Sequence, residues 1–368
     1  MIKPYTSLYI HVPFCHHKCD YCAFYSLPNA SLENQQKYIQ KISDQCHSYS
    51  SQTQPLQSIF IGGGTPSALS LENLCKLLSA VKQNFTLTPQ CEWTMEANPE
   101  SLTPEKIACL AEAGVNRISI GIQSFQNKLR TILGRQGTLH NLDNIMQALS
   151  QYNIQNLNFD LIYNIPKETL QEWQYDLKTA LSFPLLHLSA YSLMLQKGTP
   201  LALRLQQSNS EDDFLNFWHL TNKITTAFDL HQYEIANFAK INHPCRHNTD
   251  IWHGATYLGL GPAATSFNGK DRFTQQPHFQ QWLADTPPEY DPIFELERAA
   301  EILAFGMRTT AGWTWKKFYS VTGMEAKSIR SNQIQKLAQA ALITVNSTGM
   351  KPTSKGLLCN DSILEELI

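Results

Sequence analysis

Short runs with strand character alternate with helical segments along the first two thirds of the chain. Aliphatic, β-branched and aromatic residues dominate six runs, at residues 7–12, 58–63, 91–97, 117–123, 157–164 and 186–193. Each run has the length of a buried strand. The intervening stretches have helical apolar spacing, notably 32–46, 71–85, 104–114, 140–152 and 169–181. This alternation predicts an α/β fold with a parallel sheet and right-handed crossovers.

The pattern changes after the sixth strand. A polar stretch at 205–213 precedes an expected helix at 214–228 and a strand-like run at 233–238. Near the end, helices at 295–308 and 325–342 are followed by a hairpin around Ser347 to Gly349, which resembles a winged-helix-like module. We therefore expect a barrel domain at 1–240, a connecting segment at 241–295 and a small domain at 296–368. Without clustered Lys or Arg, packing or partner docking is favoured for the last domain over nucleic-acid binding.

Composition excludes several classes of protein. The 368 residues are 42% hydrophobic, enough for a large core. With 29 basic against 31 acidic residues, the chain shows no sign of electrostatic capture of nucleic acid. Its apolar runs are short, and His11 and Pro13 interrupt the first, so neither a signal peptide nor a membrane span is expected. Nine cysteines, mostly scattered singly, favour a reduced cytoplasmic location over a disulfide framework.

Three cysteines, Cys15, Cys19 and Cys22, lie within eight positions directly after the first strand. A structural zinc site is one interpretation, but it would take a fourth ligand from a second cluster, and none follows downstream. Three core cysteines are a second interpretation, which the His, Lys and Asp residues of this segment disfavour. An iron–sulfur cluster with three irons held by thiolates and the fourth left open fits best. An open iron is able to bind a further ligand.

Polar residues also gather where the predicted strands end. Gly62 to Thr65 follow the second strand, and Glu96, Gln123 and Asp160 stand at or near the ends of the next three. In barrels of strand–helix units, functional groups lie at these carboxyl ends. Each residue alone could be a capping or core group with its own partner. Together they favour a ligand site.

The spacing Cys-x3-Cys-x2-Cys resembles the signature of radical SAM proteins. In those proteins the open iron of a [4Fe–4S] cluster is chelated by the amino and carboxylate groups of S-adenosylmethionine (SAM). Electron transfer into the sulfonium then breaks a carbon–sulfur bond and yields a 5'-deoxyadenosyl radical. The resemblance implies a partial (β/α)6, TIM-like barrel.

Longer strings extend the resemblance to nearly the whole chain. They include "LYIHVPFCHHKCDYCAF", "IGGGTPS", "MEANPES", "RISIGIQSFQNKLRTILGRQ", "NFDLIYNIP" and "CRHNTDIWHGATYLGLGPAATSF". These are similar to the family of oxygen-independent coproporphyrinogen III oxidases and the heme chaperones of the HemW type. The resemblance implies cluster ligands Cys15, Cys19 and Cys22, contacts to SAM from Tyr9, Gly63 and Glu96, and a pocket completed by Gly64, Thr65, Gln123, Arg135 and Asp160.

Small differences separate the two branches of this family. The oxidases carry a further cysteine two places after the third, where this chain has Phe24. "HNTDIW" at 247–252 resembles the His-Asn-x-x-Tyr-Trp motif of the chaperones, and histidine is a frequent ligand of heme iron. Ile251 stands where that motif has Tyr, and Gly137 where a histidine is expected. We expect an irregular segment that presents His247 outward as a candidate heme ligand; the alternative is a turn in which His247 and Asn248 cap backbone.

The resemblance therefore implies a heme chaperone that binds a SAM-ligated cluster and heme. Its expected partners are heme and heme-accepting proteins, membrane-associated acceptors included. Nucleic acid is not expected, and a homodimer stays open. An oxygen-independent coproporphyrinogen III oxidase and a radical SAM enzyme that acts on RNA are the alternatives. The near-neutral charge argues against RNA.

Overall fold

The computed structural model describes residues 2–205 and 211–368, so part of the polar stretch at 205–213 lies outside it. Within the described ranges one sheet has the strand order β14-β13-β12-β11-β1-β4-β5-β6-β7-β8-β10-β9. Seven neighbouring strands in it are parallel. They are β11 (Tyr257–Leu260), β1 (Tyr5–Val12), β4 (Thr53–Gly63), β5 (Leu87–Ala97), β6 (Arg117–Gln123), β7 (Asn156–Tyr163) and β8 (His187–Ser192). All six expected strands are present, and the α/β fold is confirmed as an open sheet rather than a closed barrel.

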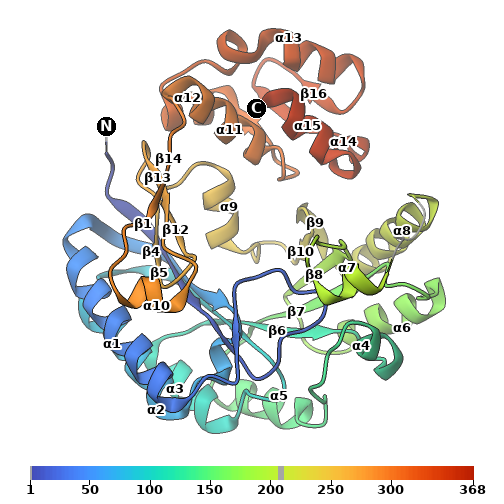
Figure 1. The fold of residues 1–368 in the computed structure, drawn as a ribbon. Helices are drawn as coiled ribbons and strands as arrows, with labels where there is room; N and C mark the ends of the chain where they lie inside the picture. Colours follow the sequence, from blue (N-terminus) through green and yellow to red (C-terminus); the bar gives the residue numbers. More distant parts are fainter. Residues whose placement is uncertain (1, 206–210) are drawn as a thin grey trace.

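Helices pack along the outer side of the curved sheet (Figure 1). Several begin at a Ser or Thr whose side chain accepts a backbone N–H of the first turn, as Ser31, Ser70, Thr103 and Thr169 do. The long helices match the predicted ones. They are α1 (Leu32–Tyr49), α2 (Leu71–Asn84), α3 (Pro104–Ala113), α5 (Leu142–Gln151), α6 (Leu170–Leu181) and α8 (Glu211–Ala227); the shorter α4 (Asn127–Ile132), α7 (Pro200–Arg204), α9 (Arg246–Trp252) and α10 (Phe279–Leu283) were not expected.

Side chains of the parallel strands alternate between two environments. On β1, Leu8 and Ile10 belong to the apolar core that also includes Tyr38 of α1. Their neighbours in the strand, Ser7 and Tyr9, point to the opposite side, because successive side chains of a strand alternate in direction. That inner side is rich in partnered polar groups, and Ser7 accepts a hydrogen bond from Ser58 Oγ of β4 at 3.0 Å. The concave side of the sheet is thus chemically equipped for a ligand.

Both flanks of the sheet depart from the prediction. The run at 233–238, expected as one strand, is a hairpin of β9 (His231–Glu234) and β10 (Asn237–Ala239), because the chain turns at residues 235–236. On the other flank, β11 is followed by β12 (Thr265–Phe267), β13 (Arg272–Thr274) and β14 (Glu289–Asp291) in the same sheet. The expected boundary at residue 240 therefore falls inside the sheet.

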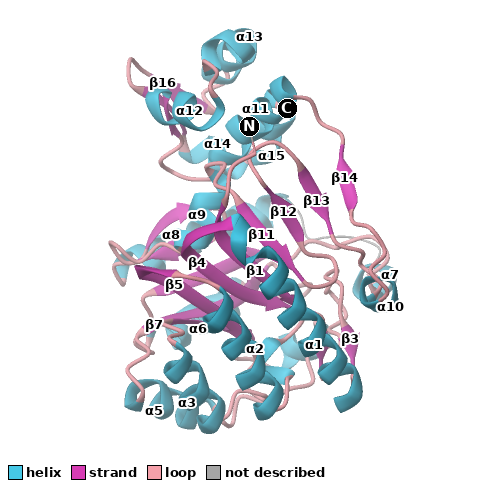
Figure 2. Ribbon diagram, turned by 90° about the vertical axis from the view of Figure 1, so that its left-hand side faces the viewer, coloured by secondary structure: helices cyan, strands magenta, loops and turns pink. Residues whose placement is uncertain are grey.

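The last part of the chain forms a separate layer beyond the end of the sheet where β1 begins (Figures 1 and 2). Leu303, Trp313, Phe318 and Ile363 are buried in a second core, which Phe267 of β12 also joins. A three-stranded sheet, β15-β17-β16, accompanies the helices, consistent with the winged-helix-like module. The elements are α11 (Glu295–Gly306), β15 (Trp313–Thr314), α12 (Trp315–Thr322), α13 (Ala326–Gln339), β16 (Ile343–Val345), β17 (Gly349–Pro352), α14 (Ser354–Leu358) and α15 (Asn360–Leu367).

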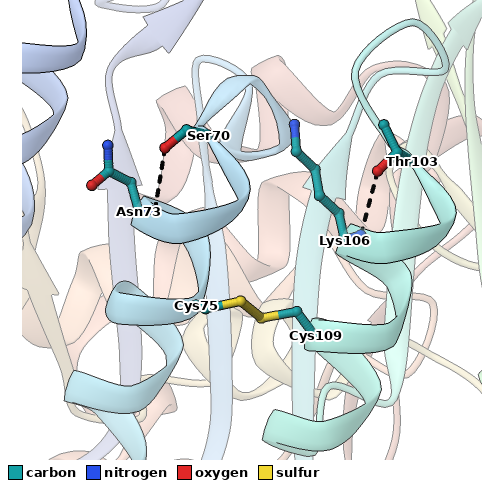
Figure 3. Close-up of a disulfide and its surroundings, with 6 residues drawn as sticks. All are labelled: Ser70, Asn73, Cys75, Thr103, Lys106 and Cys109. Atoms are coloured by element: carbon teal, nitrogen blue, oxygen red, sulfur yellow. Dashed lines mark hydrogen bonds between the residues drawn. A yellow bond between two sulfur atoms is a disulfide. The ribbon is translucent and has the colours of Figure 1, made fainter.

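A disulfide joins Cys75 of α2 to Cys109 of α3, with 6.1 Å between their Cα atoms (Figure 3). The expectation of scattered single cysteines is wrong for this pair. The two residues are 34 positions apart, and only the packing of α2 against α3 brings them together. Of the helices that the structure describes, none has the length and apolar character needed to cross a membrane.

Candidate cofactor site

A cavity of about 470 Å³ opens at the carboxyl ends of the parallel strands. Its wall includes the cysteine loop that follows β1, the glycine-rich loop that follows β4, and the ends of β5, β6 and β7. The cavity brings together most of the residues implied by the family resemblance: Cys15, Cys19, Cys22, Gly63, Gly64, Thr65, Glu96, Gln123, Arg135 and Asp160. Tyr9 and His247 do not line it.

The cysteine loop is fixed at both of its ends. A two-stranded sheet of β2 (Phe14–Cys15) and β3 (Leu27–Pro28) closes its base. Within the loop, Cys22 N donates to Cys19 O at 3.1 Å, and Asp20 N donates to Leu133 O at 3.0 Å. These bonds hold three thiols toward one cavity although the loop has little regular structure.

Side-chain hydrogen-bond donors face two of the three sulfurs. Thr65 Oγ1 lies 3.5 Å from Cys15 Sγ, and Arg135 Nη1 lies 3.6 Å from Cys19 Sγ. Burial raises the pKa of the Cys15 and Cys22 thiols, so the unligated loop favours neutral thiols. A bound metal centre would reverse this preference because it binds thiolates.

The donor set fits an iron–sulfur cluster. Three soft sulfur ligands, with a guanidinium beside them to balance charge, are the chemistry that such clusters use. Among residues 2–205 and 211–368, no three His, Cys, Asp or Glu side chains are grouped to hold one metal ion. A cubane cluster has a different requirement, since each thiolate binds a separate iron.

The glycine-rich loop allows a close approach between strands. Gly63 has a φ of +107°, and a Cβ there would lie 2.5 Å from the ring of His11. A Cβ on Gly62 would lie 2.7 Å from a carboxylate oxygen of Glu96. The bare backbone lets Gly63 N donate to Glu96 Oε2 at 3.1 Å. The loop thus positions a carboxylate at the cavity wall.

Two carboxyl groups meet in this wall. Burial, with a smaller contribution from the charge of Asp160, raises the pKa of Glu96 to about 8. Burial also raises the pKa of Asp160, although its oxygens accept hydrogen bonds from Ser119 Oγ and Asn158 Nδ2, both at 2.9 Å. Hydroxyl groups of a ligand could donate to such carboxyls, as the hydroxyls of a ribose do.

Gln123 and Arg135 form the side of the cavity next to β6. Gln123 has a φ of +68° at the end of β6, where the pairing with β7 shifts register. Residues with a side chain adopt that conformation at an energetic cost, and such positions cluster at ligand sites. Arg135 donates to Gly121 O at 2.7 Å, while its Nε has no hydrogen-bond partner among the described residues.

Asn98 is a site residue that the sequence analysis missed. Its Nδ2 donates to Thr65 Oγ1 at 3.0 Å, and its Oδ1 accepts from Arg135 Nη2 at 2.6 Å. It therefore links the two side chains that face the cysteine sulfurs. Asn98 lies in the string "MEANPES". In that string only Glu96 was predicted as a site residue, because a carboxylate in an apolar strand is the stronger indication of a ligand site.

Tyr9 lies on the concave side of β1, behind the cavity wall. Its hydroxyl forms a hydrogen bond with His11 Nδ1 at 3.0 Å, and its ring lies near that of Phe60. Burial raises the pKa of Tyr9, and Glu96 contributes to that shift. Tyr9 is therefore a neighbour of the site rather than part of its lining.

The prediction of an irregular segment that presents His247 outward is wrong. His247 lies in α9 with only 3% of its surface exposed. Its Nδ1 forms a hydrogen bond with Ser58 Oγ at 2.9 Å, and burial lowers its pKa to about 3. Backbone N–H groups of Arg246 and His247 donate to the carboxylate of Glu92, each at 3.0 Å.

The rest of the "HNTDIW" motif is tied to Glu234. Asn248 Nδ2 donates to Glu234 Oε1 at 3.3 Å, and the Trp252 indole N–H donates to Glu234 Oε2. Ser58 and Glu92 lie at the middle of β4 and β5, before the strand ends that line the cavity. The motif thus anchors a helix against the middle of the sheet, and its role in heme ligation stays a prediction.

A family model of the Radical SAM superfamily matches residues 9–180. A coproporphyrinogen III oxidase (HemN) structure from Escherichia coli has the same fold, with a TM-score of 0.85 and 18% identity over 99% of this chain and 90% of that one. The matched residues and the shared fold together indicate the radical SAM class of proteins.

Curated relatives narrow the class. The heme chaperone HemW of Synechocystis is 32% identical over 88% of this chain and 83% of its own length. HemW of Bacillus subtilis is 30% identical over 97% of each chain. The chain belongs to the HemW family of radical SAM proteins.

Proposed function

We propose that the protein is a heme chaperone that carries a [4Fe–4S] cluster with SAM on its open iron, binds heme and delivers it to acceptor proteins. The observation that carries the proposal is the shared cavity of Cys15, Cys19 and Cys22 with the glycine loop, Glu96 and Arg135. The name of the curated HemW relatives supports the heme part.

Within this proposal each side of the cavity has a separate task. The three thiols would hold the cluster, while Thr65 and Arg135 would donate to its sulfur ligands. Glu96 and Asp160 would accept the ribose hydroxyls of SAM, and the unpaired Nε of Arg135 offers one more donor in a confined space. When bound, the cluster and SAM supply a reducible sulfonium next to the cavity. Analysis of the products for 5'-deoxyadenosine measures cleavage of that group.

Oxygen-independent coproporphyrinogen III oxidase is the second candidate, because the fold is shared with HemN. Phe24 disfavours it. This residue is 69% exposed at the cavity mouth, where the resemblance places an additional cysteine in the oxidases. We expect no more than trace conversion of coproporphyrinogen III by anaerobic protein supplied with SAM and reductant. Substantial decarboxylation would restore the oxidase interpretation.

The proposed function also implies where the protein acts and which proteins it meets. We propose a cytoplasmic protein whose acceptors include membrane-associated heme proteins, with a homodimer as one state to test. An RNA-modifying function is disfavoured by the balance of 29 basic and 31 acidic residues. Salt-dependent retention of RNA by the purified protein would bring that function back.

Heme delivery can be tested directly. Protein with a reconstituted cluster is loaded with heme, separated from free heme, and mixed with an apo heme protein of distinct Soret absorption. The proposal predicts that heme is transferred faster from this protein than from heme bound to serum albumin. Heme retention without transfer, or no heme binding by the wild type, contradicts it.

A further inference from the structure

Large apolar side chains are exposed around the mouth of the cavity. Phe24, on the cysteine loop, is 69% exposed, and Met194, just after β8, is 64% exposed. Tyr191, at the end of β8, is 43% exposed. All three line the same cavity. Exposed apolar side chains that share one rim are typical of ligand-binding surfaces.

Metal-binding side chains stand on the same rim. His17 is exposed and lines the cavity, whereas its neighbour His16 is exposed but does not line it. An imidazole is a common axial ligand of heme iron, and a methionine thioether is another. His17 and Met194 come from the two loops that carry the apolar rim residues.

A cation completes the rim. Lys18 also lines the cavity, and its Nζ donates to Phe24 O at 3.1 Å. That bond holds the ammonium at the Phe24 backbone and leaves its other N–H groups for an acidic partner. The rim thus offers apolar surface, an iron ligand and a positive charge, which are the features that a flat, dianionic metalloporphyrin requires.

The interior of the cavity has a different character. Glu96, Asp160, Gln123 and Arg135 line the cavity there together with the cysteine loop. These polar groups suit SAM, so a porphyrin would lie across the mouth rather than inside. His247 offers no competing ligand in this structure, because its Nδ1 is hydrogen-bonded to Ser58 and its ring is buried.

We infer that heme binds across this mouth, between Phe24 and Met194, with His17 as an axial ligand and Lys18 near a propionate. The inference rests on the proposed heme function and identifies the site that serves it. It assigns heme to the cofactor side of the sheet, away from the "HNTDIW" helix.

Titration of hemin into anaerobically reconstituted protein tests this assignment, followed by the Soret band and by intrinsic fluorescence quenching. His17→Ala is expected to weaken binding about tenfold or more and to shift the Soret maximum, since an iron ligand is lost. His16→Ala, on the same loop, serves as the matched control and should match the wild type. Iron, sulfide and SAM binding are measured in every variant.

The outcomes separate the inference from the proposed function. Wild-type protein that binds no heme overturns both. Heme binding that is unchanged in His17→Ala, with the cluster intact, overturns the inference alone. If His17→Ala loses the cluster, the variant Met194→Ser decides, because Met194 follows β8 and lies outside the cysteine loop. Unchanged affinity in that variant overturns the inference, and a loss of about tenfold supports it.

Discussion

The guanidinium of Arg135 lies 3.6 Å from the sulfur of Cys19 while its other nitrogen donates to Asn98. Arg135, held by Asn98, therefore places a permanent positive charge beside Cys19, one of the expected cluster ligands. Charge and hydrogen bonds at the sulfurs are among the factors that set the reduction potential of an iron–sulfur cluster.

Removal of this charge should make the cluster harder to reduce. Arg135→Gln is expected to lower its midpoint potential by tens of millivolts, because the reduced cluster carries one more negative charge and loses its nearest cation. Redox titration monitored by electron paramagnetic resonance measures the shift. Lys76→Gln, a change on the exposed surface of α2, should leave the potential where it is.

Asn98→Ala should give a smaller shift in the same direction. The amide fixes Arg135 and Thr65 but adds no charge of its own. Asn98→Ser, which keeps a polar group, should recover part of the potential. An unchanged midpoint in Asn98→Ala would mean that Arg135 holds its position without the amide.

Glu96 should make the stability of the cofactor-free protein depend on pH. Its pKa is about 8 when folded against 4.5 ordinarily, so the folded state retains a proton that the unfolded chain has released between these values. This contribution to stability is complete below about pH 4.5 and is lost as pH rises toward 8, with a slope of at most about 1.4 kcal/mol per pH unit. Urea denaturation across this range should show a flatter profile for Glu96→Gln than for the wild type.

Other buried carboxyls share that range, so the difference between two proteins is the informative quantity. Burial raises the pKa of Glu168 to about 8 and that of Asp176 to about 6. Glu112→Gln provides a matched control at the outer end of α3. Parallel profiles for wild type and Glu96→Gln would show that Glu96 is ionised in the folded protein.

His247→Ala should destabilise the fold and leave heme affinity nearly unchanged. Loss of the buried ring removes its contact with Phe60 and leaves the hydroxyl of Ser58 without its imidazole partner, which costs about 2–4 kcal/mol. Chemical denaturation gives the free energy of unfolding, and hemin titration below the transition gives the affinity. A large loss of heme binding in a stable His247→Ala protein would favour the motif as the heme site.

The bond between Cys75 and Cys109 should be detectable by differential alkylation. In unfolded, unreduced protein these two thiols are expected to resist labelling, while the exposed Cys359 reacts. Closing a loop of this length stabilises a fold by about 3–4 kcal/mol in the chain-entropy view, so Cys75→Ala should lower the free energy of unfolding. Full labelling of both residues without reductant would place them in the thiol form.

Sequence periodicity predicted most of the fold because the central strands are short runs rich in β-branched residues. In β6, Ile118, Ile120 and Ile122 alternate with polar or small residues, and this period of two is visible without tertiary information. β11 was not predicted as a strand because it has only four residues, one of them glycine. It is defined by its pairing with β1. The hairpin of β9 and β10 was predicted as one strand because the residues at its turn have the composition of a strand.

The site was predictable to the extent that its residues lie at the ends of those strands. Gly63, Glu96, Gln123 and Asp160 were expected to converge because carboxyl ends of parallel strands meet at one edge. The surroundings of His247 were not predictable. Its burial depends on Glu92, 155 positions away, whose carboxylate accepts the first N–H groups of α9. Contacts of that range leave no trace in local sequence.

The central claim is that Cys15, Cys19 and Cys22 hold a cluster whose open iron faces the SAM residues. The most direct measurement is the electron paramagnetic resonance spectrum of the reduced, anaerobically reconstituted protein before and after SAM is added, together with its iron and sulfide content. The account predicts about four irons and four sulfides per chain, a spectrum that SAM changes, and loss of the signal in Cys15→Ala, Cys19→Ala and Cys22→Ala. Stoichiometric zinc that survives iron loading, or a cluster spectrum indifferent to SAM, would contradict it.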